Sequence, residues 1–214
     1  MNRSTARRGF TLIELMVVVA IIGILATAAY SISTAALKNA RVDTAMDELV
    51  AQLGSLRAEA LTNLTDRIFV LVDAPASGGA ARVFVLSGPT AAWTLSAFNP
   101  ASPAANLTEG VEDDRTLNAA LRLATVTSRA PPPLQTVSFL DSTMMGTCGG
   151  NRCFALRFRS NGDVRGELPA GGNASRPGFG FVVTSNLEAE GSTAYKRRAI
   201  VVGFPTGVVK SYSP

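Results

Sequence analysis

Residues 9–29 read GFTLIELMVVVAIIGILATAA, and this apolar stretch determines the predicted structure of the N-terminal region. From Phe10 to Ala29 the only ionisable residue is Glu14. About twenty helical residues at about 1.5 Å each span about 30 Å, the thickness of a bilayer's hydrocarbon core. The residues before the stretch include three arginines, Arg3, Arg7 and Arg8. Because positive charge stays on the cytoplasmic side, we predict a transmembrane segment over residues 10–30 that is followed by an exported region.

Glu14 distinguishes this stretch from simpler apolar segments. A carboxylate inside a membrane span costs about 2.5–3.5 kcal/mol on insertion scales, so we expect it to have a partner. Two other interpretations stay open. A secretory signal peptide would use Ala26-Thr27-Ala28 as a small-residue cleavage site, although the apolar helical pattern continues past Ala28 without a break. A plain membrane anchor would account for the length and the arginines but would leave Glu14 unexplained.

The residues from Gly9 to Leu25 resemble the class III leader and membrane helix of type IV pilins and type II secretion pseudopilins. The resemblance implies that prepilin peptidase removes residues 1–9 as a leader peptide by cleaving after Gly9. The same enzyme would methylate the new amino group of Phe10. Glu14 would act in filament assembly by pairing with the freed N-terminus of a neighbouring subunit. Such an ammonium group would offset the cost of burying the carboxylate.

The net charge of the chain depends strongly on this leader. The sequence has 20 Lys+Arg and 16 Asp+Glu, a net charge of +4. Removing the three leader arginines leaves 17 basic and 16 acidic residues, a net charge of +1. Composition therefore does not favour nucleic acid or an anionic surface as a general partner.

Helical periodicity continues beyond the apolar stretch. Apolar residues recur at steps of three and four, at Ala45, Met46, Leu49, Leu53, Leu56, Ala60 and Leu64. No proline interrupts residues 10–64, so we predict one long helix, apolar all round in its first half and amphipathic in its second. The apolar stripe is where we expect a globular domain to pack.

From residue 65 the apolar pattern changes to a period of two. Residues 67–73 and 82–87 predict a hairpin, and further strands are predicted at 135–140, 153–159, 179–184, 197–204 and 207–211. Phe154, Leu156 and Phe158 alternate with more polar positions, which predicts an antiparallel sheet with one wet face. Residues 99–118 and 160–178 are expected to be long connections. The predicted fold class is α+β, a long N-terminal helix packed on an antiparallel β-sheet domain in residues 65–214.

The exported domain also resembles minor pilins and pseudopilins of the GspH, FimT and FimU type. Three motifs carry this resemblance: Leu56-Arg57-Ala58-Glu59-Ala60-Leu61, Phe158-Arg159-Ser160-Asn161-Gly162, and Arg198-Ala199-Ile200-Val201-Val202 before a glycine-centred turn. The resemblance implies a pilin-like fold with a β-sandwich, in a subunit that primes or caps a type IV pilus or a type II secretion pseudopilus near its tip.

That resemblance also sets the expected location and partners. The chain would cross the bacterial inner membrane once, place its C-terminal domain in the periplasm and then enter the filament. Its partners would be other pilin or pseudopilin subunits, prepilin peptidase, inner-membrane lipid, and a tip adhesin or secreted cargo. Some relatives linked to DNA uptake end in a Gly-Arg-x-Arg type tail. Here the turn reads Gly207-Val208-Val209-Lys210, so we do not expect DNA binding.

Several catalytic classes are excluded by composition. The sequence has no histidine, which excludes histidine-dependent triads and histidine metal sites. It contains no Walker loop and no G-x-S-x-G elbow. We therefore predict a structural protein without enzymatic activity, cofactor or metal. The alternative is a membrane-anchored exported binding protein or enzyme whose leader only resembles that of a pilin.

Two short clusters remain. Glu112-Asp113-Asp114 could suggest a calcium site, but three consecutive acids lack the alternate spacing of a calcium loop, so we interpret them as a solvated turn. Cys148 and Cys153 are too few for a structural zinc site. Their spacing suits a disulfide in a short loop in an oxidising compartment, and a pair of free buried thiols is the alternative.

Overall fold

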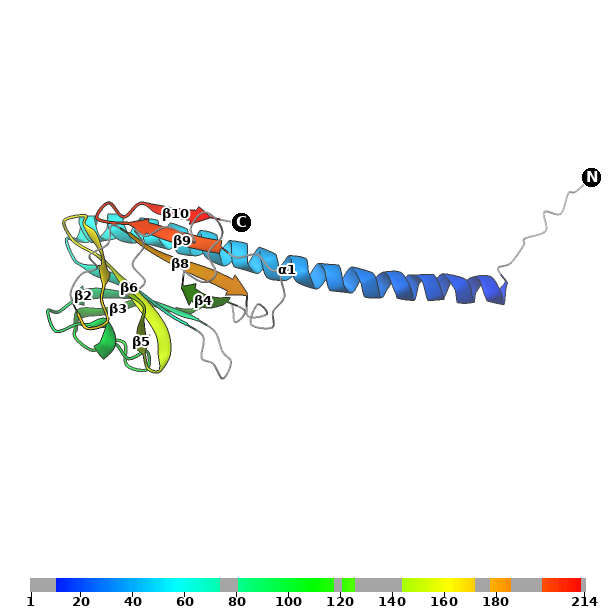
Figure 1. Cartoon of the computed structure of the whole chain (residues 1–214), viewed down its shortest axis with the longest axis horizontal. Helices are drawn as coiled ribbons and strands as arrows, with labels where there is room; N and C mark the ends of the chain where they lie inside the picture. The colour runs from blue at the N-terminus through cyan, green and yellow to red at the C-terminus, as the bar shows by residue number, and fades with distance from the viewer. Residues whose placement is uncertain are drawn as a thin grey trace, which may run out of the picture. The chain divides into compact units, whose positions relative to one another are not determined.

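The computed structural model describes residues 11–73, 81–117, 121–125, 144–171, 178–185 and 198–212. The chain divides into two compact units, Met1–Leu37 and Lys38–Pro214. Helix α1 (Leu12–Asn63) runs through both units (Figure 1). In the second unit it is followed by β-strands and the short 3₁₀ helix η1 (Leu95–Ala97).

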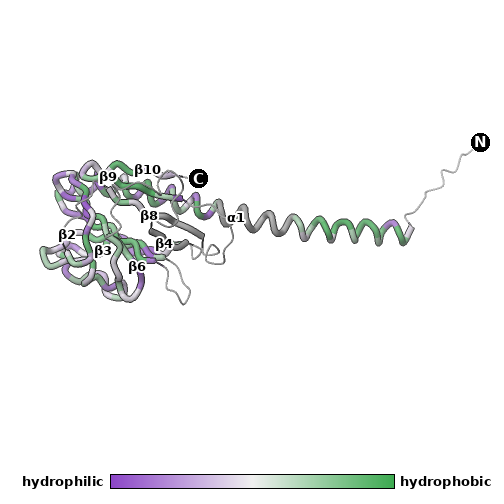
Figure 2. Tube along the Cα trace, in the orientation of Figure 1, coloured by the Kyte–Doolittle hydropathy of each residue, from purple (hydrophilic) through white to green (hydrophobic). Residues whose placement is uncertain are grey.

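The first unit contains the apolar start of α1. All side chains of residues 11–28 are exposed, and Figure 2 shows this stretch as predominantly hydrophobic. Within the part of the chain that the structure describes, no helix is both long and apolar enough to cross a membrane. The transmembrane segment over residues 10–30 stays a prediction from the sequence, as do the domain limits at residues 9 and 64.

The second unit contains two antiparallel sheets. The larger has the order β3-β2-β1-β6-β5, and β7 also pairs with β6. Its strands are β1 (Arg67–Val72), β2 (Arg82–Pro89), β3 (Leu107–Thr116), β5 (Gly146–Cys148), β6 (Asn151–Phe158) and β7 (Val164–Glu167). The smaller has the order β10-β9-β8-β4, with strands β4 (Leu121–Thr125), β8 (Gly178–Ser185), β9 (Arg198–Gly203) and β10 (Val209–Tyr212).

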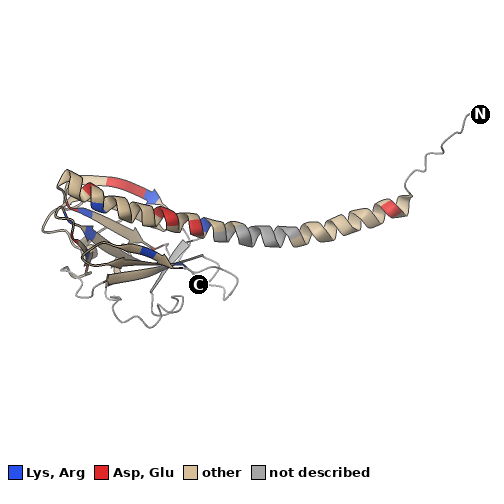
Figure 3. Ribbon diagram, turned by 90° about the horizontal axis from the view of Figure 1, so that it is seen from above, with Lys and Arg blue, Asp and Glu red and all other residues tan. Residues whose placement is uncertain are grey.

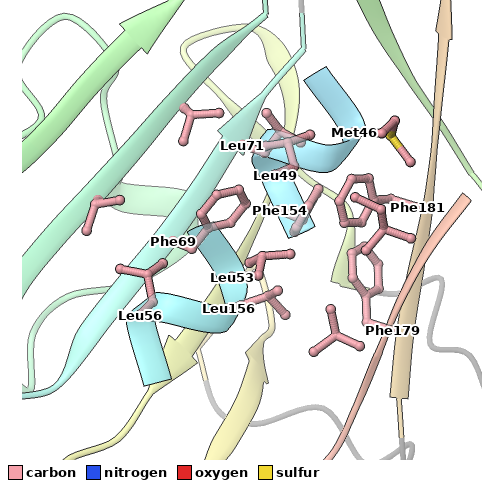
Figure 4. Close-up of a cluster of buried hydrophobic side chains, with 14 of the residues drawn as sticks. Met46, Leu49, Leu53, Leu56, Phe69, Leu71, Phe154, Leu156, Phe179 and Phe181 are labelled. Atoms are coloured by element: carbon pink, nitrogen blue, oxygen red, sulfur yellow. The ribbon is translucent and has the colours of Figure 1, made fainter. Parts of the chain in front are cut away.

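The main core joins α1 to both sheets. Leu49 and Leu53 of α1 are completely buried among side chains of β1, β6, β8 and β9 (Figure 4). The ring of Phe154 on β6 lies 4.7 Å, centroid to centroid, from the rings of both Phe179 and Phe181 on β8. Burial of large apolar groups is the dominant favourable term in folding, so this shared core is what holds α1 and the two sheets together. The predicted fold class, a helix on antiparallel sheets, is confirmed.

The predicted apolar stripe is buried except at its last member. Residues from Ala45 to Ala60 of the stripe lie in the main core, whereas Leu64 is 77% exposed. Helix α1 ends at Asn63, and Leu64 has a φ of 53°, in the left-handed region that terminates helices. The chain therefore leaves the helical direction before Leu64 can reach the core, and its inclusion in the stripe was wrong.

The prediction of one wet sheet face was also wrong. The face of the larger sheet that points away from α1 carries a second apolar cluster, including Ile68, Val70, Phe84 and Leu86, all completely buried. Residues 90–100, here called the cover segment, contribute Trp93, Leu95 and Phe98 to this cluster. Continuous apolar runs such as residues 68–72 are typical of strands buried on both faces. The expected alternation was therefore only partly present in the sequence.

Several elements lie where connections were expected. Strand β3 falls within residues 99–118 and β7 within residues 160–178, while neither β4 nor β5 was predicted. The side chains of β3 are mostly polar and none is fully buried, so the strand lacks an apolar alternation. The predicted strand at residues 135–140 lies outside the described residues. The other predicted strands are present, with ends that differ by a few residues.

Candidate functional site

The first turn of α1 is closed by three hydrogen bonds between Thr11 and Glu14. Glu14 Oε2 accepts hydrogen bonds from the backbone N–H of Thr11 (3.0 Å) and from Thr11 Oγ1 (3.1 Å). In return, the backbone N–H of Glu14 donates to Thr11 Oγ1 (3.3 Å). This arrangement is a capping box, which satisfies N–H groups that have no partner at a helix start.

The capping box gives Glu14 a role inside its own chain. Sequence reasoning missed it, although Thr11-Leu12-Ile13-Glu14 has the Ser/Thr-x-x-Glu spacing that signals it. A helix cap contributes about 1 kcal/mol, and a carboxylate in the first turn also interacts favourably with the helix dipole. Pairing with a neighbouring subunit is therefore not needed to account for an acidic residue at this position.

Apolar side chains surround the capped turn. Leu12, Ile13, Leu15 and Met16 are between 63% and 78% exposed. Exposed apolar groups on all sides of a helix indicate that lipid or another protein normally contacts it. Gly9 and Phe10, the predicted cleavage and methylation positions, lie outside the described residues, so their geometry relative to Glu14 stays a prediction.

The first two motifs of the exported domain and the glycine-centred turn that follows the third meet at one place, here called the motif junction. Arg57 Nε donates a hydrogen bond to the carbonyl oxygen of Gly162 (3.0 Å). A Cβ added to Gly162 would lie 3.1 Å from Leu61 Cδ2, and one added to Gly207 would lie 2.6 Å from Val164 Cγ2. The junction therefore fastens the end of α1 to the β6–β7 and β9–β10 turns, which is a structural role within the monomer.

A row of ion pairs links β3 to α1 and to strands β1 and β2. Figure 3 marks the acidic and basic residues along the ribbons of the strands and of α1. Arg115 on β3 pairs with Glu48 on α1, and Gln52 on α1 donates to Asp113 (3.0 Å). Arg115 Nε also lies 3.2 Å from Asp113 Oδ2, but without the geometry of a hydrogen bond. Strand β3 is paired with β2 through its backbone, and these polar contacts with α1 add to that pairing in a strand that has little apolar surface of its own.

The same row corrects the interpretation of Glu112-Asp113-Asp114 as a solvated turn. These residues lie in β3, and each carboxylate faces an arginine. Glu112 pairs with the buried Arg67, and Asp114 accepts two hydrogen bonds of 2.8 Å from Arg82. Among the described residues, no group of three or more Cys, Asp or Glu side chains is placed to hold a metal ion.

Glu109, near the start of β3, accepts hydrogen bonds from two hydroxyl groups. Ser87, which is completely buried, donates to Glu109 Oε2, and Thr65 Oγ1 donates to Glu109 Oε1 (3.1 Å). These hydrogen bonds, the Ser87 bond first, lower the pKa of Glu109 below its usual value near 4.5, with a further contribution from the charge of Arg67. Desolvation acts in the opposite direction but is smaller.

The two cysteines are joined in the structure. Cys148 at the end of β5 and Cys153 in β6 form a disulfide with a Cα–Cα distance of 5.8 Å. Both are completely buried in the second apolar cluster, next to the cover segment. The bond therefore crosslinks the β5–β6 hairpin and lies on the face of the larger sheet that is remote from α1.

Comparison with known families finds a match at the N-terminus. Residues 4–30 match a family described as the prokaryotic N-terminal methylation motif. The matched range includes Gly9, Phe10 and Glu14, so this chain carries a type IV pilin-like prepilin leader. No curated protein and no solved structure matches the chain significantly.

Proposed function

We propose that this protein is a minor pilin or pseudopilin. It is a structural subunit that is processed at the inner membrane, and it primes or caps a type IV pilus or a type II secretion pseudopilus near the tip. The observation that carries the proposal is the methylation motif over residues 4–30, which runs into an apolar helical segment with Glu14 in its first turn. The helix on antiparallel sheets supports it, because a pilin-like domain needs both.

In this proposal, prepilin peptidase cleaves between Gly9 and Phe10 and methylates the new amino group. The exposed apolar side chains of residues 12–28 contact inner-membrane lipid before assembly and other pilin subunits afterwards. The C-terminal domain lies in the periplasm. Glu14 pairs with the α-amino group of a neighbouring Phe10, which compensates for taking the carboxylate out of water.

The cleavage step has a direct test. We expect Gly9→Val to block processing, because it puts a branched side chain where the peptidase needs close approach to the backbone. Mass spectrometry of the mature N-terminus should find methylated Phe10 in the wild type and the intact leader in the variant. An unchanged mature mass in the variant contradicts the leader assignment. A start near Ala29 supports a secretory signal peptide.

The role of Glu14 requires a variant that separates its charge from its capping contacts. Glu14→Gln provides it, because glutamine also closes a capping box but carries no charge. We expect Glu14→Gln and Glu14→Ala both to stay abundant in the membrane fraction and to be depleted from sheared filaments. We expect Glu14→Asp to be intermediate because its side chain is shorter. If Glu14→Gln enters filaments as well as the wild type does, Glu14 is only a helix cap, and the result favours the plain membrane anchor.

A further inference from the structure

The cover segment (residues 90–100) is buried but has little regular structure. Trp93, Leu95 and Phe98 are at most 5% exposed, although only residues 95–97 form a short 3₁₀ helix. Its ends are held by two hydrogen bonds, from Thr90 N to Asn106 O (3.0 Å) and from Arg82 Nη1 to Pro100 O (3.2 Å). Between these ends, Ser96 N donates to Pro169 O (3.1 Å), and the other backbone hydrogen bonds are local turns, such as Phe98 N to Leu95 O (3.2 Å). None of residues 90–100 belongs to a strand, so the segment depends largely on the apolar side chains beneath it.

The β5–β6 hairpin forms part of that support. Cys148 Sγ lies 3.7 Å from the carbonyl oxygen of Leu95, in the middle of the cover segment. A Cβ added to Gly146 would lie 3.3 Å from Leu95 Cδ2, and one added to Gly149 would lie 3.1 Å from Pro100 Cδ. The hairpin thus contacts the cover segment at its centre and at its end.

This hairpin is short, and its crosslink is the disulfide. Strand β5 has three residues, Gly146–Cys148, paired with Asn151–Cys153. In the larger sheet β6 is also paired with β1 and β7, whereas β5 lies at the edge and pairs with β6 at three residues, so β5 is the weakly held strand of the hairpin. The Cys148–Cys153 bond joins its two strands at the level of Leu95.

We propose that the Cys148–Cys153 disulfide is a redox lock on the cover segment. When a dithiol reductant reduces it, the S–S bond breaks, two thiols form, and the reductant becomes a disulfide; two electrons and two protons pass to the protein. The edge strand β5 then separates from β6, the cover segment loses this support and opens, and the apolar face with Ile68, Val70 and Phe84 becomes accessible. A disulfide-bearing oxidant runs the exchange backwards and closes the cover. The second apolar cluster is thus fully covered only in an oxidising compartment.

The effect is confined to one face of the larger sheet. Successive side chains of a strand point to opposite faces, so Cys153 lies with the cover segment while Phe154 lies in the main core. The chain-entropy treatment of a six-residue loop predicts that losing the crosslink raises the opening equilibrium of the hairpin and its cover by up to about 40-fold. Helix α1 and its core should keep their protection.

Hydrogen exchange of the full chain in detergent micelles tests the lock. On complete reduction with dithiothreitol, we expect exchange in residues 90–100 to accelerate by up to about 40-fold, with residues 49–60 of α1 unchanged. Trp93 is the single tryptophan, so its quenching by acrylamide should increase in parallel. The double variant Cys148→Ala/Cys153→Ala is the control for the reductant, and dithiothreitol should not change its exchange.

Three results would overturn the proposal. One is unchanged exchange and quenching in the cover segment of fully reduced wild type. The second is equal acceleration in residues 90–100 and 49–60, which would make the bond a general stabiliser of the domain. The third is a response of the double-alanine variant to dithiothreitol, because that effect cannot pass through the disulfide.

Discussion

Gly207→Ala tests whether the motif junction depends on close packing of the β9–β10 turn. Gly207 has a φ of 65°, and an added Cβ would lie 2.6 Å from Val164 Cγ2 and 3.3 Å from Arg57 Cδ. The left-handed backbone costs a non-glycine residue about 1–2 kcal/mol. Overpacking against the completely buried Val164 adds about 1–3 kcal/mol. We therefore expect Gly207→Ala to lower the free energy of unfolding by about 2–5 kcal/mol.

The matched control is Gly150→Ala. Gly150 also has a positive φ, 87°, but an added Cβ would meet no atom within 4 Å. Urea unfolding followed by circular dichroism should show only the backbone cost there, about 1–2 kcal/mol. In a Val164→Ala background, which removes the methyl group that the new Cβ would strike, Gly207→Ala should cost less. Equal costs for the two glycine variants, or an unchanged cost in the Val164→Ala background, would refute the packing argument.

Three further predictions concern the second unit. Glu109→Gln should lower the free energy of unfolding above about pH 4.5, because the folded state lowers the pKa of this carboxyl. The difference in free energy of unfolding from the wild type should shrink as the pH falls through that lowered pKa. Urea unfolding at pH 7 and pH 3 measures this difference, and a difference independent of pH would contradict the prediction. Gly54→Ala should stabilise α1 by up to about 1 kcal/mol, since an added Cβ meets nothing within 4 Å, and a fall in melting temperature would show an unrecognised contact. A fragment of residues 38–214 should be soluble, with mixed helix and strand in circular dichroism, because this range forms its own compact unit. An unfolded, aggregating fragment would show that the unit boundary is misplaced.

Some of the fold could be predicted because it depends on neighbours in sequence. The stripe through Leu49 and Leu53 predicted which side of the helix packs on the domain, since residues three and four apart lie on one face. The β1–β2 hairpin followed from two apolar runs separated by a turn-rich stretch. The capping box at Thr11 and Glu14 was equally local, and only the Ser/Thr-x-x-Glu signal was overlooked.

The leader is determined by the sequence alone. The arginines, Gly9, Phe10 and the apolar run are contiguous, and the match to the methylation motif over residues 4–30 uses no tertiary information. The Cys148–Cys153 disulfide could be predicted only in part from the sequence. The spacing made a disulfide feasible, but only the structure places it under Leu95 rather than in an exposed loop.

Tertiary structure decided the elements that are stabilised by distant partners. Strand β3 has no apolar period, and it forms by pairing with β2; its side chains then meet α1, where Arg115 pairs with Glu48, which is 67 positions earlier in the chain. No element was predicted for the cover segment, because Trp93 and Phe98 have no helical or strand spacing, yet both contribute to the second apolar cluster. Ion pairs and apolar contacts between segments far apart in sequence produce no periodic pattern within either segment, so they could not be predicted from the sequence. A helix or strand places every third to fourth or every second side chain on one face, so its apolar face can be predicted from the sequence, whereas contacts between distant segments form only when the chain folds.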